Sequence, residues 1–336
     1  MSETRSSTNS NRPLLLAPAY RHALWGGDKL RDEYGHVASG GESPAESWLC
    51  STHAGYVSRI ASGEFKGRSL AELIKDHPDW LGSKYEIFGD LPVMLKLIDA
   101  KEALSLQVHP DDEYAAIHEE GGMGKTELWY VLDAEPGASL TYGFLHETNR
   151  EEVLEWMERG VIGEHVRKLP VSRGDVRLVD AGAIHGIGAG ILVAEVQENS
   201  NLTYRLWDYD RTDENGEKRE LHIDKALDVL NYGTGRVIRR PIRQLRHMRG
   251  FSMELIGRCR YFETYRVTVN AVTKESSVSY AASDESYEIF LCMEGELEIN
   301  CKGESIILKK GSCMFIPAHT EDILITGSAQ LLRVRS

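Results

Sequence analysis

Cysteine is scarce in this chain, and none of its cysteines is spaced like a metal-binding pair. The 336 residues contain five cysteines, which are scattered and include no Cys-x-x-Cys motif. An odd number of widely spaced thiols argues against a disulfide framework and is typical of a reducing compartment. We therefore expect a cytoplasmic protein without structural disulfides.

Long apolar runs and an excess of basic charge are also missing. No run is long enough to span a bilayer, and the polar first dozen residues lack the apolar stretch of a signal peptide. Asp and Glu outnumber Lys and Arg by 52 to 39, for a formal net charge of −13. Nucleic acids and anionic membranes attract basic surfaces, so we expect neither as a partner. A small anionic substrate stays compatible with this balance, because a few local cations suffice to bind it.

Short strand-like segments, punctuated by glycine, aspartate and proline, occupy most of the chain. Helical periodicity with capping signals is restricted to residues 69–82, 110–122, 148–160 and 222–233. Many short strands with few helices indicate a mainly β protein built from barrels or sandwiches. The length of 336 residues favours two domains over one.

A weak internal repeat supports a division into two domains. One element runs from a glutamate through an apolar strand and an acidic turn into a second strand, and another runs from a glycine through a short strand into a turn. The paired segments are residues 127–140 with 288–299, and residues 174–187 with 311–323. Two copies of one β unit are the simplest explanation. We expect a domain 1–240 with inserted helices and a smaller domain 241–336, joined by an arginine-rich connector.

The stretch "LSLQVHPDD" (residues 104–112) carries polar side chains on one face of an extended run. Successive strand residues point to opposite faces, so Ser105, Gln107 and His109 share one side while Leu104, Leu106 and Val108 share the other. The apolar side serves as core. The polar side requires a function of its own.

A later stretch resembles the second motif of the cupin superfamily, G-x5-P-x-G-x2-H. Gly174, Gly182 and His185 stand at the matching positions, and Asp180 replaces the proline. The resemblance implies a small β-barrel with a metal at its mouth. Taken alone, His185 would be an ordinary polar turn residue in a glycine-rich loop.

The first cupin motif, a pair of metal-binding groups two residues apart followed by a glutamate, is matched by Gln107, His109 and Glu127, with a predicted helix inserted before the glutamate. Two imidazoles, a carboxylate and an amide oxygen can hold a divalent cation such as Zn²⁺ and leave a position open for water or substrate. Taken alone, Glu127 could be a salt-bridged strand end. Together these groups indicate a metal site, since burying them unpaired inside a barrel would be costly.

Several blocks in combination resemble the type I mannose-6-phosphate isomerases, in particular their short bacterial form. The resemblance covers the chain from about Pro18 to the end and is carried by "LSLQVHPDDEYA", "GKTELWYVLDAEPGA" and "TYRLWDYDR". It implies two cupin-type β-barrel or jelly-roll domains. It also implies a zinc-dependent interconversion of mannose 6-phosphate and fructose 6-phosphate through a cis-enediol. One zinc ion per chain would be held by Gln107, His109, Glu127 and His185.

The same resemblance implies that Arg205 is an active-site residue. A fixed guanidinium charge can stabilise a developing oxyanion, although an arginine between Tyr204 and Trp207 could also simply stack on aromatic rings at a surface. Lys125 lies two residues before Glu127 and would line the pocket.

The groups that would bind the phosphate and move the proton stay open at this point. Ser105, Lys125 and residues 96–101 are candidates for binding the phosphate. The general base is not identified by the sequence. Glu195 and the His or Lys groups near the implied zinc are candidates, and Glu195 could equally be a structural carboxylate.

Two other function classes fit the same fold. A cupin oxygenase would place Fe(II) on the same ligands, but polar, phosphate-suited surroundings disfavour it. A non-catalytic sugar-binding cupin is disfavoured by the intact ligand set and by Arg205. The C-terminal copy is expected to bind no catalytic metal, because Asp322 stands where His185 would be matched and no histidine pair precedes Glu288. The oligomeric state is left open.

Overall fold

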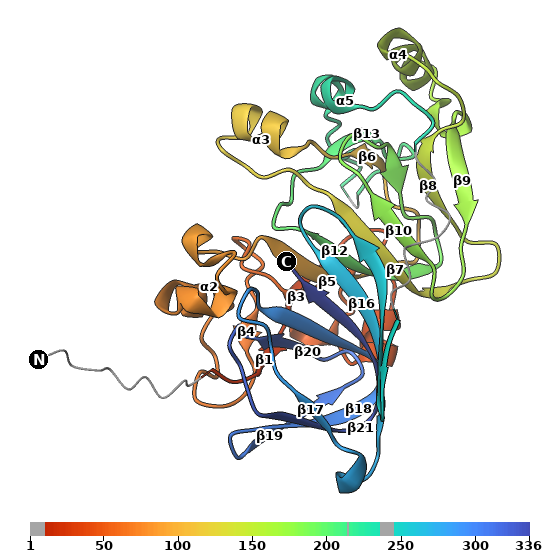
Figure 1. The fold of residues 1–336 in the computed structure, drawn as a ribbon. Coiled ribbons are helices and arrows are strands. Elements are labelled where there is room, and N and C mark those ends of the chain that lie inside the picture. The colour runs from red at the N-terminus through yellow and green to blue at the C-terminus, as the bar shows by residue number, and fades with distance from the viewer. Residues whose placement is uncertain (1–10, 214, 236–244) are drawn as a thin grey trace, which may run out of the picture. The chain divides into compact units, whose positions relative to one another are not determined.

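A computed structural model describes residues 11–213, 215–235 and 245–336 and confirms a mainly β protein with few helices (Figure 1). The described residues form two compact units. Unit 1 combines residues 11–19, Leu49–Val93 and residues 245–336. Unit 2 combines Tyr20–Trp48 with residues 94–235.

The predicted boundary between residues 240 and 241 lies in the segment 236–244, outside the described residues, and the division into 1–240 and 241–336 stays a prediction. Unit 1 also takes in N-terminal segments. The reason is strand pairing: β1 (Leu14–Ala17) is antiparallel to both β20 (Cys313–Ile316) and β4 (Arg59–Ile60). Pairing between segments so distant in the chain leaves no periodic signal in the sequence.

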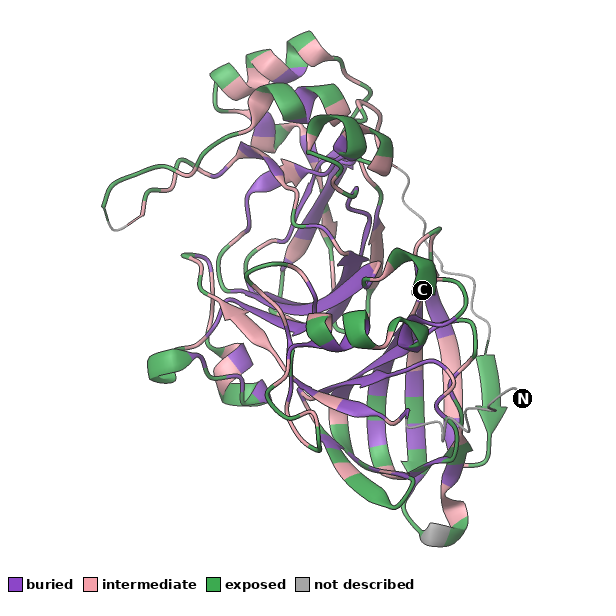
Figure 2. Cartoon of the chain, turned by 90° about the vertical axis from the view of Figure 1, so that its left-hand side faces the viewer, coloured by how far each residue is buried: buried purple, intermediate pink, exposed green. Residues whose placement is uncertain are grey.

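Unit 1 is built on one sheet of ten strands, and its resolved pairs are antiparallel. In sheet order, the further strands are β14 (Leu245–Met248), β15 (Phe251–Arg258), β16 (Glu263–Ala271), β21 (Ile323–Arg335) and β18 (Glu288–Cys301), and then β20, β1 and β4, with β17 (Val278–Tyr280) on β21 and β19 (Glu304–Lys309) on β18. Buried and exposed residues alternate along several of these strands (Figure 2), which places one face of the sheet on a shared apolar core.

One expected turn is absent from unit 1. The acidic segment after Cys292 was predicted to separate two strands, as it does in the first copy. Instead β18 continues through it with a bulge between Cys292 and Glu294, and both halves pair with β21. A β-bulge accommodates the extra residue by bending the strand, and the long partner strand keeps the ladder continuous.

Unit 2 contains two sheets, apart from the terminal residues of β2, β3 and β5, which belong to unit 1. The six-stranded sheet has the order β10 (Val176–Val179), β7 (Glu127–Ala134), β12 (Ile191–Glu198), β5 (Val93–Ala100), β3 (Glu46–Cys50) and β2 (Ala19–Arg21). The five-stranded sheet has the order β13 (Tyr204–Trp207), β6 (Leu106–Val108), β11 (His185–Gly186), β8 (Ser139–Phe144) and β9 (Val166–Pro170). A hydrophobic cluster joins side chains from both sheets.

Alternation in the five-stranded sheet separates core from site. Leu106 and Val108 of β6, with Tyr204 and Leu206 of β13, lie in a second cluster that also holds residues of α4 and α5. The residues between them therefore point to the opposite face. The predicted alternation is confirmed within β6, but Leu104, expected on the apolar face with Leu106 and Val108, instead lines the cavity and packs in the first cluster, because it precedes the strand.

Short helices complete the fold. They are α1 (Lys29–Tyr34), α2 (Leu70–Asp76), α3 (Asp112–His118), α4 (Arg150–Glu158) and α5 (Ile223–Val229), with 3-10 turns η1 (Ser39–Gly41), η2 (Pro78–Leu81), η3 (Glu86–Phe88), η4 (Ile162–Glu164) and η5 (Lys274–Ser276). The four predicted helices are confirmed by α2 to α5, and α1 was not predicted. Ser69 and Glu72 form a capping box that starts α2. In the described part of the chain, no helix has the length and apolar character needed to cross a membrane.

Candidate active site

Three buried side chains from three strands converge in unit 2. His109 follows β6, Glu127 opens β7 and His185 opens β11. The Nε2 atom of His109 lies 3.1 Å from Nε2 of His185 and 3.1 Å from Oε1 of Glu127. One ligand atom of each residue lies within 4.8 Å of the others, a geometry that could hold a metal ion. The structure thus brings together three of the four predicted ligands directly.

Gln107, the fourth predicted ligand, lies beside this group. Its Cα is the register partner of His185 on β11 and of Arg205 on β13. Directly paired residues of antiparallel strands share a face, so the three side chains form a row across the sheet. Gln107 Nε2 is 3.4 Å from His185 Nε2, and the Ser105 hydroxyl donates to Gln107 Oε1 at 3.3 Å.

Both imidazoles are neutral near pH 7. Burial lowers the pKa of His109 to about 3 and also lowers the pKa of His185. His185 Nδ1 lies 2.8 Å from the Ala183 carbonyl oxygen, an acceptor, so this nitrogen carries the proton and Nε2 presents its lone pair to the other ligands.

Lys125 and Glu127 form a buried ion pair, with Nζ 2.6 Å from Oε1. Burial alone would raise the pKa of Glu127, but the Lys125 ammonium and His109 reverse the effect and hold that pKa well below its usual range. Burial alone would lower the pKa of Lys125, but the Glu127 carboxylate raises it. Glu127 is therefore a carboxylate and Lys125 an ammonium at neutral pH.

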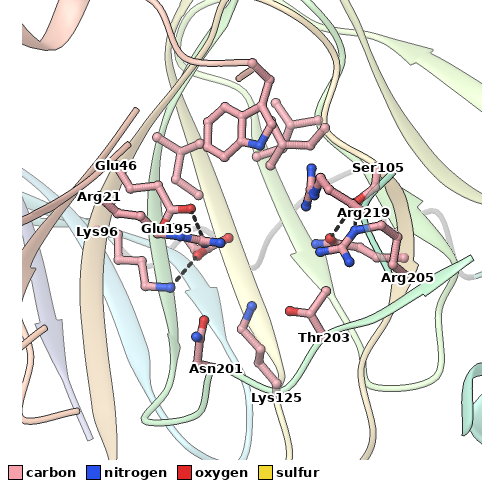
Figure 3. A pocket seen from close by; sticks show the side chains of 15 residues that line it. Arg21, Glu46, Lys96, Ser105, Lys125, Glu195, Asn201, Thr203, Arg205 and Arg219 are labelled. Carbon is pink, nitrogen blue, oxygen red and sulfur yellow. Dashed lines mark hydrogen bonds and ion pairs between the residues drawn. The ribbon is translucent and has the colours of Figure 1, made fainter. Parts of the chain in front are cut away.

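Unit 2 contains a cavity of about 210 Å³, whose lining side chains are shown in Figure 3. Gln107 and Lys125 line it and contact the buried group of three converging side chains, so they form the wall between that group and the cavity. Lys125 was predicted to line a pocket. Ser105 and Arg205 also line the cavity, and their roles toward a substrate stay predictions.

One side of the cavity holds a carboxylate–ammonium network. Glu195 Oε2 accepts a hydrogen bond from Trp129 Nε1 at 2.8 Å, and Glu195 Oε1 lies 3.8 Å from Lys96 Nζ. Burial raises the pKa of Glu195 to about 7 and lowers that of Lys96 to about 8. Glu46 adds a second carboxylate, paired with Arg21 at 2.8 Å.

Arg205 is anchored by polar groups. Its Nε donates to the Ser105 hydroxyl at 3.3 Å and its Nη1 donates to the Glu220 carbonyl at 2.7 Å. The side chain is partly buried. These contacts fit an arginine that faces the cavity better than one that stacks on Tyr204 and Trp207.

Sequence reasoning assigned no role to five polar residues that line the cavity: Arg21, Glu46, Asn201, Thr203 and Arg219. Glu46 opens β3, a strand that was not singled out in the sequence. Arg21 and Arg219 belong to no recognised motif. Arg219 lies in a polar connection, whose composition is typical of a solvent-exposed turn.

In the C-terminal copy, the glutamate that matches Glu127 is paired with an arginine instead of lying beside histidines. Glu288, the counterpart of Glu127 in the repeat, is buried and accepts two hydrogen bonds from Arg333, one of them from Nε at 2.8 Å. Tyr280 also donates to Glu288. A guanidinium neutralises the carboxylate at this position. Asp322, where a ligand histidine would be matched, is exposed.

Two family models match separate segments of the chain. A model for the catalytic domain of type I phosphomannose isomerase matches residues 14–138. A model for the cupin domain of mannose-6-phosphate isomerase matches residues 253–336. The two segments together span more than half of the chain.

Named relatives are similar along nearly the whole chain. The probable mannose-6-phosphate isomerase GmuF of Bacillus subtilis (strain 168) is 34% identical over 326 residues, which cover 95% of this chain and 98% of the relative. The mannose-6-phosphate isomerase of Streptococcus mutans is 33% identical over 329 residues, with 96% and 98% coverage. A crystal structure of the mannose 6-phosphate isomerase from Bacillus subtilis matches with a TM-score of 0.84 and 32% identity, covering 96% of this chain and 99% of that chain.

Proposed function

Since the chain belongs to the type I mannose-6-phosphate isomerase family, we propose that it interconverts mannose 6-phosphate and fructose 6-phosphate through a cis-enediol. The observation that carries the proposal is the convergence of His109, Glu127 and His185 beside a cavity lined with cationic side chains. Such an isomerase moves a proton between C1 and C2 and stabilises negative charge that develops on oxygen. The cavity offers side chains for both tasks.

We propose that one zinc ion per chain is held by Gln107, His109, Glu127 and His185. Neutral imidazoles and an ionised carboxylate are the states that a metal requires. Glu127 Oε2 is buried and finds no hydrogen-bond partner among the described residues, so a cation there would supply the missing contact. When bound, the ion would polarise the sugar oxygens and offset the charge of the enediolate.

Gln107 would complete the set through its amide oxygen. The amide nitrogen now faces His185, and a flip of the amide group exchanges the two atoms. The Ser105 hydroxyl, which donates to the oxygen before the flip, can accept from the nitrogen after it. Ser105 therefore supports either orientation.

Glu195 is our candidate for the residue that takes the proton from one carbon and returns it to the other. It lines the cavity, and its pKa of about 7 suits a base that works near neutral pH. The Trp129 hydrogen bond fixes one carboxylate oxygen and leaves the other near Lys96. Lys125 is a weaker candidate for the base because its pairing with Glu127 keeps it protonated.

Arg205, Lys125 and Ser105 are proposed to act on the substrate. The Arg205 guanidinium is held by two polar contacts, so its charge is already oriented when the enediolate forms. Lys125 and Ser105 line the same cavity and can donate to sugar hydroxyls or oxyanions.

Two further parts of the proposal concern the barrel architecture of the two domains and the cellular location of the protein. We propose two cupin-type barrels, the first with helical insertions and a metal, the second without a catalytic metal; the family match over residues 253–336 supports the second barrel. A cytoplasmic location, with no nucleic-acid or membrane partner, stays a prediction from composition.

A coupled assay on zinc-loaded protein tests the function. We expect isomerisation of mannose 6-phosphate, with a much lower kcat/KM for free mannose, because the remote phosphate supplies binding energy for positioning the reacting carbons. No turnover of either sugar would leave a sugar-binding cupin, and oxygen consumption with Fe(II) would indicate an oxygenase. Near-equal kcat/KM values would instead indicate an isomerase of unphosphorylated sugars.

A further inference from the structure

Two arginines stand together at one side of the cavity of unit 2. Figure 3 shows Arg205 and Arg219 near Ser105, and it shows Glu195 and Lys96 on the other side. Arg205 belongs to β13, whereas Arg219 belongs to the connection between β13 and α5. The cavity is therefore cationic on one side and carries the proposed base on the other.

The charges of these arginines are poorly balanced by neighbouring carboxylates. Arg205 forms no ion pair with a carboxylate among the described residues; its partners are a hydroxyl and a backbone carbonyl. Among the described residues, Arg219 forms an ion pair with Oδ1 of Asp208 alone, at 3.3 Å, and it shares that atom with Arg211, which is closer at 2.6 Å. Arg211 has a second carboxylate within reach, Glu102 at 3.7 Å. The side of the cavity at Arg205 and Arg219 therefore carries excess positive charge.

Burial makes this excess costly in the absence of an anion. The Arg219 side chain is 28% exposed and Arg205 is also partly buried. Burial, followed by repulsion from Arg219, lowers the pKa of Arg205 to about 10. Charges taken out of water normally require a partner of opposite sign, so the arrangement suits a bound anion.

We propose that Arg219 binds the phosphate of the substrate and thereby sets the preference for phosphorylated sugars. This inference rests on the proposed function, which it deepens by assigning the phosphate site. A phosphate monoester carries about two negative charges at neutral pH, and a guanidinium can bind it with two parallel hydrogen bonds. Ser105 and Thr203, which also line the cavity, offer hydroxyl donors to the same group.

The positions of the two arginines along the sheet assign them different tasks. Arg205 is the register partner of Gln107, which in turn is the partner of His185. Two strand spacings, roughly 10 Å, therefore separate the backbone of Arg205 from that of His185. Arg219 lines the cavity from the connection after β13 and is not part of these strands. In a hexose 6-phosphate the phosphate is on the carbon farthest from C1, so a sugar whose C1–C2 end lies near His185 directs its phosphate toward this side.

The two arginines also differ in how firmly their side chains are held, and this difference supports Arg219 as the residue that binds the phosphate. Arg205 is fixed by two hydrogen bonds, which suits a group that must be oriented for the reaction. Arg219 has one long contact with a carboxylate that keeps Arg211 as its nearer partner. If Arg219 left Asp208 to bind a phosphate, Asp208 would still be paired with Arg211.

Arg219→Met and Arg211→Met are a matched pair of variants for the test. Each removes one arginine from Asp208, but only Arg219 lines the cavity. Calorimetric titration of the zinc-loaded full chain with inorganic phosphate measures the site without turnover. We expect Arg219→Met to raise the Kd for phosphate and the KM for mannose 6-phosphate by about 10- to 100-fold, with kcat changed little. Arg211→Met should leave phosphate affinity as in the wild type.

Three results would overturn the assignment: wild-type phosphate affinity in Arg219→Met, equal losses in the two variants, or a loss confined to kcat. Arg219→Lys, which keeps a point charge, should restore part of the affinity, and thermal unfolding of each variant separates misfolding from lost binding. The proposed function fails separately, because wild-type protein that binds phosphate but does not isomerise mannose 6-phosphate would refute the reaction and leave the phosphate site standing.

Discussion

Lys125 Nζ lies 2.6 Å from Glu127 Oε1, and both side chains are buried; Glu127 belongs to the proposed metal centre, whereas Lys125 also lines the cavity. The ammonium neutralises the carboxylate that the metal would use. A bound cation and the Lys125 ammonium would therefore compete for the Glu127 carboxylate. A substrate that draws Lys125 away from Glu127 would strengthen metal binding.

Removal of Lys125 should separate metal binding from activity. Lys125→Met takes away a positive charge next to the proposed metal site, so we expect it to retain a full complement of zinc while kcat/KM falls. His185→Ala removes a proposed ligand, and we expect it to lose the metal. Metal analysis of both variants and the wild type measures this. Equal metal content in His185→Ala and wild type would contradict the ligand assignment.

Substitution of Arg205 should reduce kcat more than it raises KM. A fixed charge gains strength as an oxyanion develops, and loss of one such donor typically costs about 10²–10³ in rate. Arg205→Ala is therefore expected to lower kcat by that order, and Arg205→Lys to recover only part of it. Steady-state kinetics decides the point. If KM rose in Arg205→Ala and kcat stayed at the wild-type value, Arg205 would be a phosphate anchor and the division of tasks with Arg219 would be wrong.

Glu198 should make the stability of the protein depend on pH. It is buried and accepts a hydrogen bond from Thr126 N–H at 2.6 Å; burial raises its pKa from 4.5 to about 7, and the nearby Asp112 adds to the increase. The folded state thus prefers the protonated form. That preference stabilises the fold fully below about pH 4.5 and is lost as the pH rises through 7.

A neutral replacement tests this linkage. Glu198→Gln can still accept from Thr126 and donate to Asp112, so its stability should decline less than that of the wild type over the same pH range, where Glu195 also titrates. We expect the free energy of unfolding in urea to favour Glu198→Gln at pH 8, and the difference from wild type to shrink toward pH 5. A difference that is constant between pH 5 and pH 8 would show that Glu198 titrates normally.

Breaking the buried pair of Glu288 and Arg333 should destabilise unit 1 strongly. Arg333→Met leaves a buried carboxylate without its counter-charge, a change that typically costs about 3–5 kcal/mol. We expect a marked loss in the free energy of unfolding, and recovery of part of it when Glu288→Gln is added, since the second change removes the uncompensated charge. Urea unfolding of the two single variants and the double variant provides the cycle. Additive losses would show that the two side chains act independently.

Local order along the chain was determined by the sequence itself. The alternation of polar and apolar residues predicted that Gln107 lies on one face of its strand and that Leu106 and Val108 lie on the other, because side chains of a strand point alternately to its two faces. The capping residue Ser69 marked the start of α2 in the same way. Resemblance to known motifs identified His109, Glu127 and His185, which the structure places within reach of one ion. These features depend on neighbouring residues or on fixed spacing, so a single sequence contains them.

Tertiary structure alone decided which distant residues share a space. Arg219, from the connection between β13 and α5, lines the cavity together with Arg205 of β13, and Glu46 reaches the same cavity from the start of β3. Neither position has a periodic or spacing signal. The pairing of β1 with β20 and the bulge that carries β18 past its expected turn are decided by partner strands far along the chain. Packing and charge balance between such segments are properties of the folded chain, and no local pattern encodes them.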